Sequence, residues 1–169
     1  MSTRAIHNYF FVKGLDTLRE GGILAFITSQ GLLDSPSNKP IREYLMNNSS
    51  LVSAIRLPEN LFTENAGTEV GSDLIVLQKN TGKGIVSEQE HLFIETVDVP
   101  DSDNPDKVLF THNAMFATES MENCVATSRK LSTNPYGKKC MVYNHEGGIE
   151  GICSCLLYTS PSPRDRTRS

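Results

Sequence analysis

The residues of this sequence best suited to chemistry lie in one loop, PENLFTENAGTEVG, at positions 58–71. Phe62 is its only aromatic residue, and a flat ring held in a loop can stack on a planar ligand. Thr63 and Asn65 add a hydroxyl and an amide that can form hydrogen bonds. The loop is long for a plain connection, which favours a functional role. A structural alternative stays open, because Phe62 could pack into the core below and the polar residues could cap turns.

A second pair of polar residues, Ser29 and Gln30, follows the first apolar run of the sequence. Ligands of α/β sheets bind beyond the carboxyl ends of the strands. The pair is therefore predicted to face the ligand side, with capping of the following loop as the alternative role.

Other motifs lack the context that their chemistry needs. Asn134-Pro135-Tyr136 is typical of a turn with proline at its second position. The glycine pairs of GTEVGS and HEGGIEG do not join a strand to a helix, as a phosphate-binding loop does. His145-Glu146 lacks the second histidine of a zinc-protease helix.

The four cysteines do not predict a metal site. Cys124 and Cys140 have no C-x-x-C spacing, and Cys155 of the Cys153/Cys155 pair belongs to the unusual tail described below. Scattered reduced cysteines are typical of a cytosolic protein, and no metal is expected.

Alternating apolar runs and an amphipathic helix predict an α/β fold. The predicted strands are Gly21–Ser29, Leu51–Pro58 and Ser72–Asn80, with a helix over Lys39–Ser49 between the first two. Near-continuous apolar runs of this length are typical of strands that are buried on both faces.

A first helix is predicted from Ser2 or Thr3 to about Arg19, where a Gly-Gly pair ends it. Its apolar residues recur at three- and four-residue spacing: Ile6, Phe10, Gly14, Leu15 and Leu18. Tyr9, Phe10 and Phe11 are expected in the core.

The blocks GGILAFITSQGLLDSPSN and RLPENLF…AGTEVGSDLIVLQKN, in this order, resemble the carboxyl-terminal half of the catalytic domain of amino-type, adenine-specific DNA methyltransferases. They are most similar to the large methylase proteins of bacterial mobile elements, in which helicase segments can follow. The resemblance covers residues 2–80 best, extends over 85–154 and ends at Cys155. It implies an α/β fold that is the carboxyl-terminal half of a class I (Rossmann-like) methyltransferase sheet, truncated at the front.

Enzymes of that family transfer a methyl group from S-adenosylmethionine to an adenine flipped out of DNA. The resemblance implies that Phe62 stacks on this base and that Thr63 and Asn65 contact DNA. The catalytic Asn/Asp-Pro-Pro-aromatic motif and the cofactor loop are expected upstream of Met1. The chain by itself is therefore expected to be inactive, and the Gly21–Ser29 strand is expected to have an unpaired edge and one bare face.

Composition sets the remaining expectations. The chain has 169 residues, 38% hydrophobic residues and a net charge of −4. The longest apolar run is far shorter than the roughly 18 residues of a membrane span, and no secretory signal is recognisable. A cytoplasmic protein without a membrane partner is expected. Because DNA-binding modules usually present a basic face, this chain alone should bind DNA poorly.

Three parts are predicted: half of a methyltransferase catalytic domain (1–82), an extension or linker (83–154) and a tail (155–169). The tail begins CLLYTSPSPRD, and a back-translation of this string resembles the transposase-end adapter of tagmentation sequencing libraries. The tail is predicted to be translated adapter, and disordered; a natural Ser/Pro/Arg-rich disordered tail is the alternative.

Two other functions stay open. The chain could be a non-catalytic DNA- or partner-binding subdomain of a restriction or helicase assembly, or half of a nucleotide-binding dehydrogenase. The sequence directly before Met1 would distinguish them, through an intact catalytic motif, its absence, or a dinucleotide glycine fingerprint.

Overall fold

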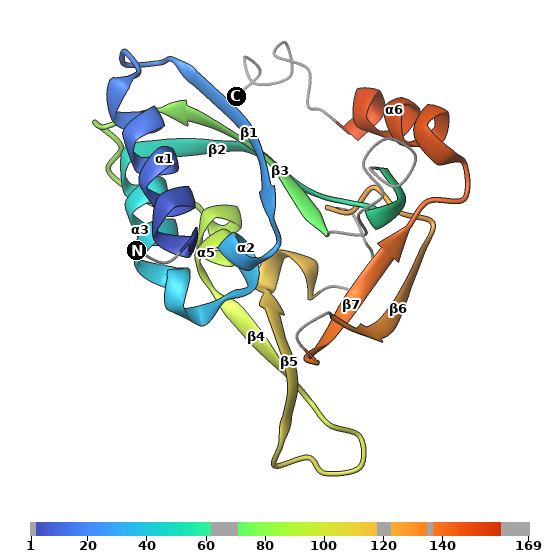
Figure 1. The fold of residues 1–169 in the computed structure, drawn as a ribbon. Helices are drawn as coiled ribbons and strands as arrows, with labels where there is room; N and C mark the ends of the chain where they lie inside the picture. The colour runs from blue at the N-terminus through green and yellow to red at the C-terminus, as the bar shows by residue number, and fades with distance from the viewer. Residues whose placement is uncertain (1–2, 62–70, 118–122, 135–136, 160–169) are drawn as a thin grey trace.

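The chain folds into helices and strands in the computed structural model (Figure 1), which describes residues 3–61, 71–117, 123–134 and 137–159. The elements in chain order are α1 Thr3–Thr17, β1 Ile23–Ser29, α2 Gly31–Asp34, η1 Pro36–Asn38, α3 Lys39–Asn48, β2 Ser49–Leu57, η2 Glu59–Leu61, β3 Ser72–Lys79, α5 Glu88–Ile94, β4 Thr96–Pro100, β5 Val108–Asn113, η3 Ala114–Phe116, β6 Ser128–Thr133, β7 Lys139–Asn144 and α6 Gly148–Thr159.

Strands β1, β2 and β3 form one sheet in the order β1-β3-β2. Strand β3 is antiparallel to both neighbours, so β1 and β2 run in the same direction. Parallel strands need a crossover connection, which here consists of α2, η1 and α3. The predicted α/β class is confirmed, and the boundaries of these strands and of α3 lie within about two residues of the predicted ones.

Helix α1 packs on one face of the sheet through residues four positions apart. Phe11 and Leu15 are buried, and the ring of Phe11 stacks on that of Phe26 in β1 with centroids 4.2 Å apart. Tyr9 and Phe10 remain 61% and 64% exposed, so their predicted place in the core is wrong. Successive residues on a helix are rotated by about 100° about its axis. The stripe that faces the sheet passes through Phe11, one residue after the Phe10 of the predicted stripe.

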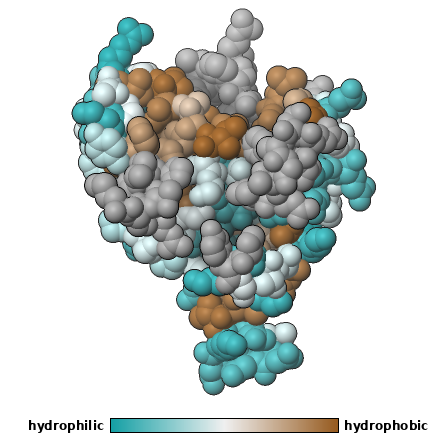
Figure 2. All heavy atoms as spheres, in the orientation of Figure 1, coloured by the Kyte–Doolittle hydropathy of each residue, from teal (hydrophilic) through white to brown (hydrophobic). Residues whose placement is uncertain are grey.

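Strand β1 is covered on one face only. Leu24 and Phe26 pack against the core, whereas Ile23 and Ile27 point the other way and are each 54% exposed. Burial on both faces was therefore a wrong prediction for β1, and the expected bare face is present. Figure 2 shows hydrophobic side chains gathered in the upper part of this view, over the sheet and over α6, while the tip of the β4–β5 hairpin is hydrophilic.

Residues 83–154, expected to be an extension or linker, carry α5, β4, β5, η3, β6, β7 and the first part of α6. The hairpins β4–β5 and β6–β7 extend from the side of the sheet, and α5 lies beside α3 (Figure 1). Phe93, Met115 and Phe116 are buried in the same apolar cluster as the sheet residues. The boundary at residue 82 stays a prediction, but the two sides of it share a core.

Helix α6 continues to Thr159, so the predicted disorder of residues 155–169 is wrong for their first part. Cys155 and Leu156 pack against a second apolar cluster that includes Ile152 of α6 and Ile55 of β2. The adapter origin of the tail stays a prediction.

Candidate functional site

The ends of the three sheet strands meet at one edge. Strand β1 ends at Ser29, opposite Ser72 at the start of β3, and Ser72 also faces Leu57 at the end of β2. The backbone N–H of Gln30 donates to the carbonyl of Gly71 over 3.2 Å, which joins the end of β1 to the residue preceding β3. Ligands bind at such carboxyl ends of parallel strands in α/β proteins. We call this region the carboxyl edge.

Two of the predicted site residues, Ser29 and Gln30, lie at the carboxyl edge as expected. Ser29 is exposed, whereas the side-chain amide of Gln30 is held over Gly71. The other three, Phe62, Thr63 and Asn65, lie outside the described residues, so their contacts stay predictions. They belong to the segment that leaves β2 and returns to β3 at this edge.

A small pocket of about 90 Å³ opens beside Ser29. Its lining combines an apolar floor with hydroxyl and amide groups: Asn8, Phe11, Thr28, Ser29, Gly31, Leu32, Ser35 and Asn38. The amide of Asn8 donates to Oδ1 of Asn38 over 3.1 Å, and so links α1 to the turn before α3. A pocket of this size can hold a few water molecules or one edge of a larger planar ligand.

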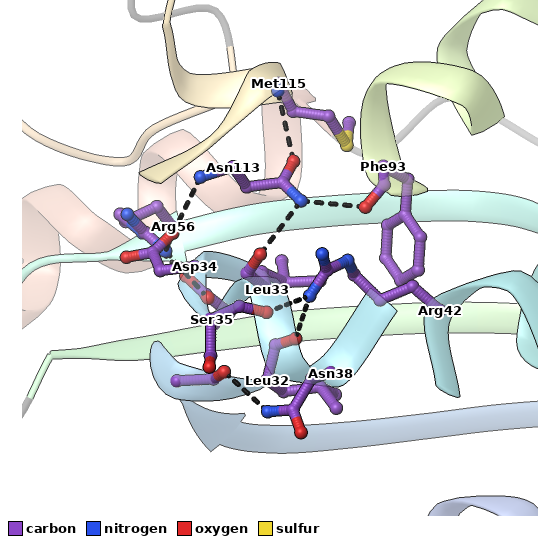
Figure 3. Close-up of polar contacts among 12 residues, drawn as sticks. Leu32, Leu33, Asp34, Ser35, Asn38, Arg42, Arg56, Phe93, Asn113 and Met115 are labelled. Atoms are coloured by element: carbon purple, nitrogen blue, oxygen red, sulfur yellow. Dashed lines mark hydrogen bonds and ion pairs between the residues drawn. The ribbon is translucent and has the colours of Figure 1, made fainter. Parts of the chain in front are cut away.

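The short helix α2, which follows Gln30, is held by side chains from distant elements (Figure 3). Arg42 of α3 is fully buried, and its Nη1 donates to the carbonyls of Leu32 and Ser35 over 2.9 and 2.8 Å. Its Nε donates to the carbonyl of Ile94 in α5 over 2.8 Å. Burial, the largest influence, lowers the pKa of Arg42 from its ordinary value, although Asp34 opposes this. Helix ends leave carbonyls unpaired, and Arg42 satisfies them here.

Asn113, at the end of β5, completes the support of α2. Its amide donates to the carbonyls of Leu33 and Phe93 over 3.2 and 2.7 Å, and its side-chain oxygen accepts from the N–H of Met115 over 3.1 Å. Its backbone N–H donates to Oδ1 of Asp34 over 2.9 Å. The wall of the pocket is therefore fixed by residues about 80 positions away in the sequence.

A buried ion-pair network lies under the carboxyl edge. Arg56 of β2 donates from Nε and Nη2 to the two carboxylate oxygens of Asp73 in β3 over 2.8 and 3.0 Å, and from Nη2 to Asp34 over 2.9 Å. The guanidinium carbon also lies 4.1 Å from the ring centroid of Phe116. Burial by itself would lower the pKa of Arg56, but the two carboxylates outweigh it and raise the pKa above its ordinary value. Arg56 is therefore a permanent cation that ties α2 to both strands.

Sequence reasoning missed this network, although a signal was present. Arg56 and Asp73 are charged residues within otherwise apolar strands, and such residues are buried only when they are paired.

No group of three or more metal-ligating side chains comes together among the described residues. Burial raises the pKa of the Cys124 thiol to about 11, so this thiol stays protonated and is a poor nucleophile. In the part of the chain that the structure describes, no helix has both the length and the apolar character needed to cross a membrane.

A family model described as N-6 DNA methylase matches residues 3–146. No curated protein matches the chain. Among solved structures, a Listeria monocytogenes protein described as a class I S-adenosylmethionine-dependent methyltransferase is similar, with 21% identity and a TM-score of 0.40. The match covers 48% of this chain and 24% of that protein, so the chain spans about a quarter of its length.

Proposed function

The chain belongs to the N-6 DNA methylase family, and from this premise we propose that it is part of a cytoplasmic, adenine-specific DNA methyltransferase. The whole enzyme would transfer a methyl group from S-adenosylmethionine to the exocyclic amine of an adenine flipped out of the duplex. The family match over residues 3–146 is the observation that carries this proposal. The sheet β1-β3-β2 would be the carboxyl-terminal half of a class I methyltransferase sheet, and association with helicase segments or a restriction system is part of the same proposal.

This chain would contribute the side of the active site that receives the base. The carboxyl edge, with Ser29 and Gln30, would face the target nucleotide. Phe62 would stack on the flipped adenine, while Thr63 and Asn65 would contact the DNA. The buried Arg56 network supports this assignment, because binding sites work best on rigidly held elements.

The described residues do not fit the cofactor. S-adenosylmethionine needs a pocket of several hundred Å³, whereas the pocket beside Ser29 measures about 90 Å³. The turn from β1 into α2 has the sequence SQG and offers a single glycine, unlike a cofactor-binding glycine loop. The methyl donor would therefore bind to other parts of the whole enzyme, and no step of the transfer is assigned to this chain.

The decisive experiment substitutes Phe62 in the complete protein that contains this chain. If the ring stacks on the flipped base, Phe62→Ala should lower kcat/KM for DNA methylation about tenfold to a hundredfold, because base stacking contributes roughly 1–3 kcal/mol. The affinity for S-adenosylmethionine should change little. Phe62→Tyr and Phe62→Trp should retain most activity, since any flat ring can stack.

A core role of Phe62 would give the opposite pattern. Phe62→Ala would then cost about 3–5 kcal/mol of stability, and Phe62→Trp would overpack the site. A lower melting temperature with unchanged activity per folded molecule would refute the stacking role. DNA binding by the complete protein without any methylation would refute the enzymatic proposal and favour a non-catalytic DNA-binding subdomain.

A further inference from the structure

One buried hydrogen-bond donor at the carboxyl edge has no partner. The side-chain nitrogen Nε2 of Gln30 is buried and makes no hydrogen bond within the described structure. Leaving such a donor unpaired costs about 1–3 kcal/mol, and buried polar groups are therefore nearly always paired. The backbone N–H of Gln30 already bonds to Gly71 and closes the edge by itself. The side-chain amide is thus not needed for the strand connection.

The side-chain amide of Gln30 lies against the backbone of Gly71. A Cβ atom at Gly71 would collide with the Gln30 amide nitrogen, carbon and oxygen, so only glycine at position 71 allows the observed arrangement. Gly71 precedes β3 directly, at the point where the segment with Phe62 returns to the sheet. The unpaired donor therefore lies where the chain enters β3, at the carboxyl edge.

Other buried polar atoms without partners have different surroundings. Nη2 of Arg42 belongs to a guanidinium whose other nitrogens make three hydrogen bonds. Nδ1 of His112 and the hydroxyl of Tyr143 belong to β5 and β7, close to the charges of Arg56. Among the unpaired atoms of the described residues, the donor of Gln30 is the one at the end of β1, where a ligand of the sheet would bind.

We propose that Gln30 reads the target base: its Nε2 donates a hydrogen bond to N7 of the flipped adenine while its Oε1 accepts from the N6 amine. This inference rests on the proposed function. A glutamine amide matches the N6/N7 edge of adenine with two hydrogen bonds. Guanine carries an oxygen where adenine carries the N6 amine, so Oε1 would face a second acceptor and guanine would be rejected. Gln30 is thereby a residue that determines which base is accepted.

The test combines a protein substitution with an atomic substitution in the DNA. The complete protein is given a duplex that contains its methylation site, mapped first on genomic DNA, with either adenine or 7-deazaadenine at the target position. The 7-deaza base lacks the N7 acceptor and keeps the N6 amine. For the natural protein, this replacement should lower kcat/KM about threefold to tenfold, the contribution of one hydrogen bond. Gln30→Leu should lower kcat/KM on adenine by at least as much, and should then be insensitive to the 7-deaza replacement.

A matched control is available at the opposite end of the sheet. Gln78 in β3 donates its amide to the carbonyl of Gly21 over 3.2 Å, away from the carboxyl edge. Gln78→Leu should keep the full sensitivity to 7-deazaadenine. Gln30→Glu, which keeps an acceptor and loses the donor, should behave like Gln30→Leu on the 7-deaza substrate.

The outcomes separate the two proposals. Gln30→Leu and the 7-deaza base could each lower kcat/KM, and their combination could lower it by the product of the two factors. Gln30 would then have a structural role only, and the inference would be overturned. An unchanged rate for Gln30→Leu on adenine overturns it as well. If the natural protein methylates no ordinary DNA, the proposed function fails before Gln30 is tested.

Discussion

The two outer strands of the sheet, β1 and β2, differ in whether their outer edges are paired. The outer edge of β2 is closed within the chain: Arg56 exchanges backbone hydrogen bonds with Asn123 and Val125, at 2.8 and 2.9 Å, and the N–H of Leu51 donates to a carboxylate oxygen of Glu90 over 2.9 Å. Strand β1 pairs with β3 alone in the described structure, and its outward face is apolar. It has no lysine, proline or bulge to protect this edge.

This difference explains the role of residues 83–154. Phe93, Phe116 and Val125 cover β2 and its neighbours, so the segment works as a closing layer for one side of the sheet. The same segment supplies Asn113, which holds α2 in place below the carboxyl edge. Closure of β2 and support of the candidate site are therefore provided by the same segment.

The largest expected effect comes from breaking the ion pair that anchors the closed edge. Arg56→Met should lower the free energy of unfolding by about 3–5 kcal/mol, because the carboxylate of Asp73 is left buried without its partner. The measurement is urea denaturation. The matched control is Lys39→Met, which removes a half-exposed ion pair with Glu95 and should cost less than about 1 kcal/mol.

A second substitution sharpens this prediction. Combining Arg56→Met with Asp73→Leu removes both charges and should recover much of the lost stability, since an apolar pair of similar volume can replace a buried ion pair. If Arg56→Met costs no more than Lys39→Met, the network does not anchor the closed edge.

The next largest effect concerns Glu90, which connects α5 to β2. Its carboxylate accepts from the N–H groups of Leu51 and Ser87 and pairs with Lys83 at 2.7 Å. Glu90→Ala should cost about 1–3 kcal/mol in urea denaturation, because two backbone donors lose their acceptor. The exposed Glu88 in the same helical turn is the control, and Glu88→Ala should change stability by less than about 0.5 kcal/mol. Equal effects of the two substitutions would contradict the role of Glu90.

The contrast between the two edges also shows what could be predicted from sequence. The strands of the sheet were predicted closely because apolar runs bounded by glycine and proline are strong local signals. The layer formed by residues 83–154 was not predicted in detail, because its strands span only five or six residues each and give weak local signals. Phe93 and Phe116 become core residues only through packing against parts of the chain far away in sequence.

The candidate site shows the same division. Ser29 and Gln30 were predicted because the end of an apolar strand can be recognised locally. The partners of Arg56 could not be predicted, because Asp73 and Asp34 lie 17 and 22 positions away in the sequence. The strand register and the position of α2 determine which carboxylates reach Arg56. Charged residues inside apolar strands indicate that a partner exists and do not identify it.

A smaller effect is expected from pH, through a histidine in the closing layer. Burial, the largest influence, lowers the pKa of His112 below its ordinary value of 6.5. The unfolded chain then binds the proton more readily than the folded one, so the free energy of unfolding should fall as the pH decreases below about 6.5. Above that pH, His112 should contribute no pH dependence. Urea denaturation of His112→Gln should show a weaker loss of stability between pH 6.5 and 5; an unchanged slope would exclude His112 as its source.

The smallest effect on folding, and the clearest test of the open edge, is expected from Ile27→Lys in β1. Ile27 is 54% exposed on the bare face, so the substitution should change the free energy of unfolding by less than about 0.5 kcal/mol. It should nevertheless weaken self-association, because a charge on an unprotected edge strand opposes pairing with another copy. Sedimentation velocity over a concentration series measures this. The control is Ile75→Lys in β3, which places the same charge at a fully buried position and should prevent folding. If Ile27→Lys associates as strongly as the natural chain, β1 is not the edge through which copies meet; if it unfolds like Ile75→Lys, the face is covered in solution and the contrast between β1 and β2 is lost.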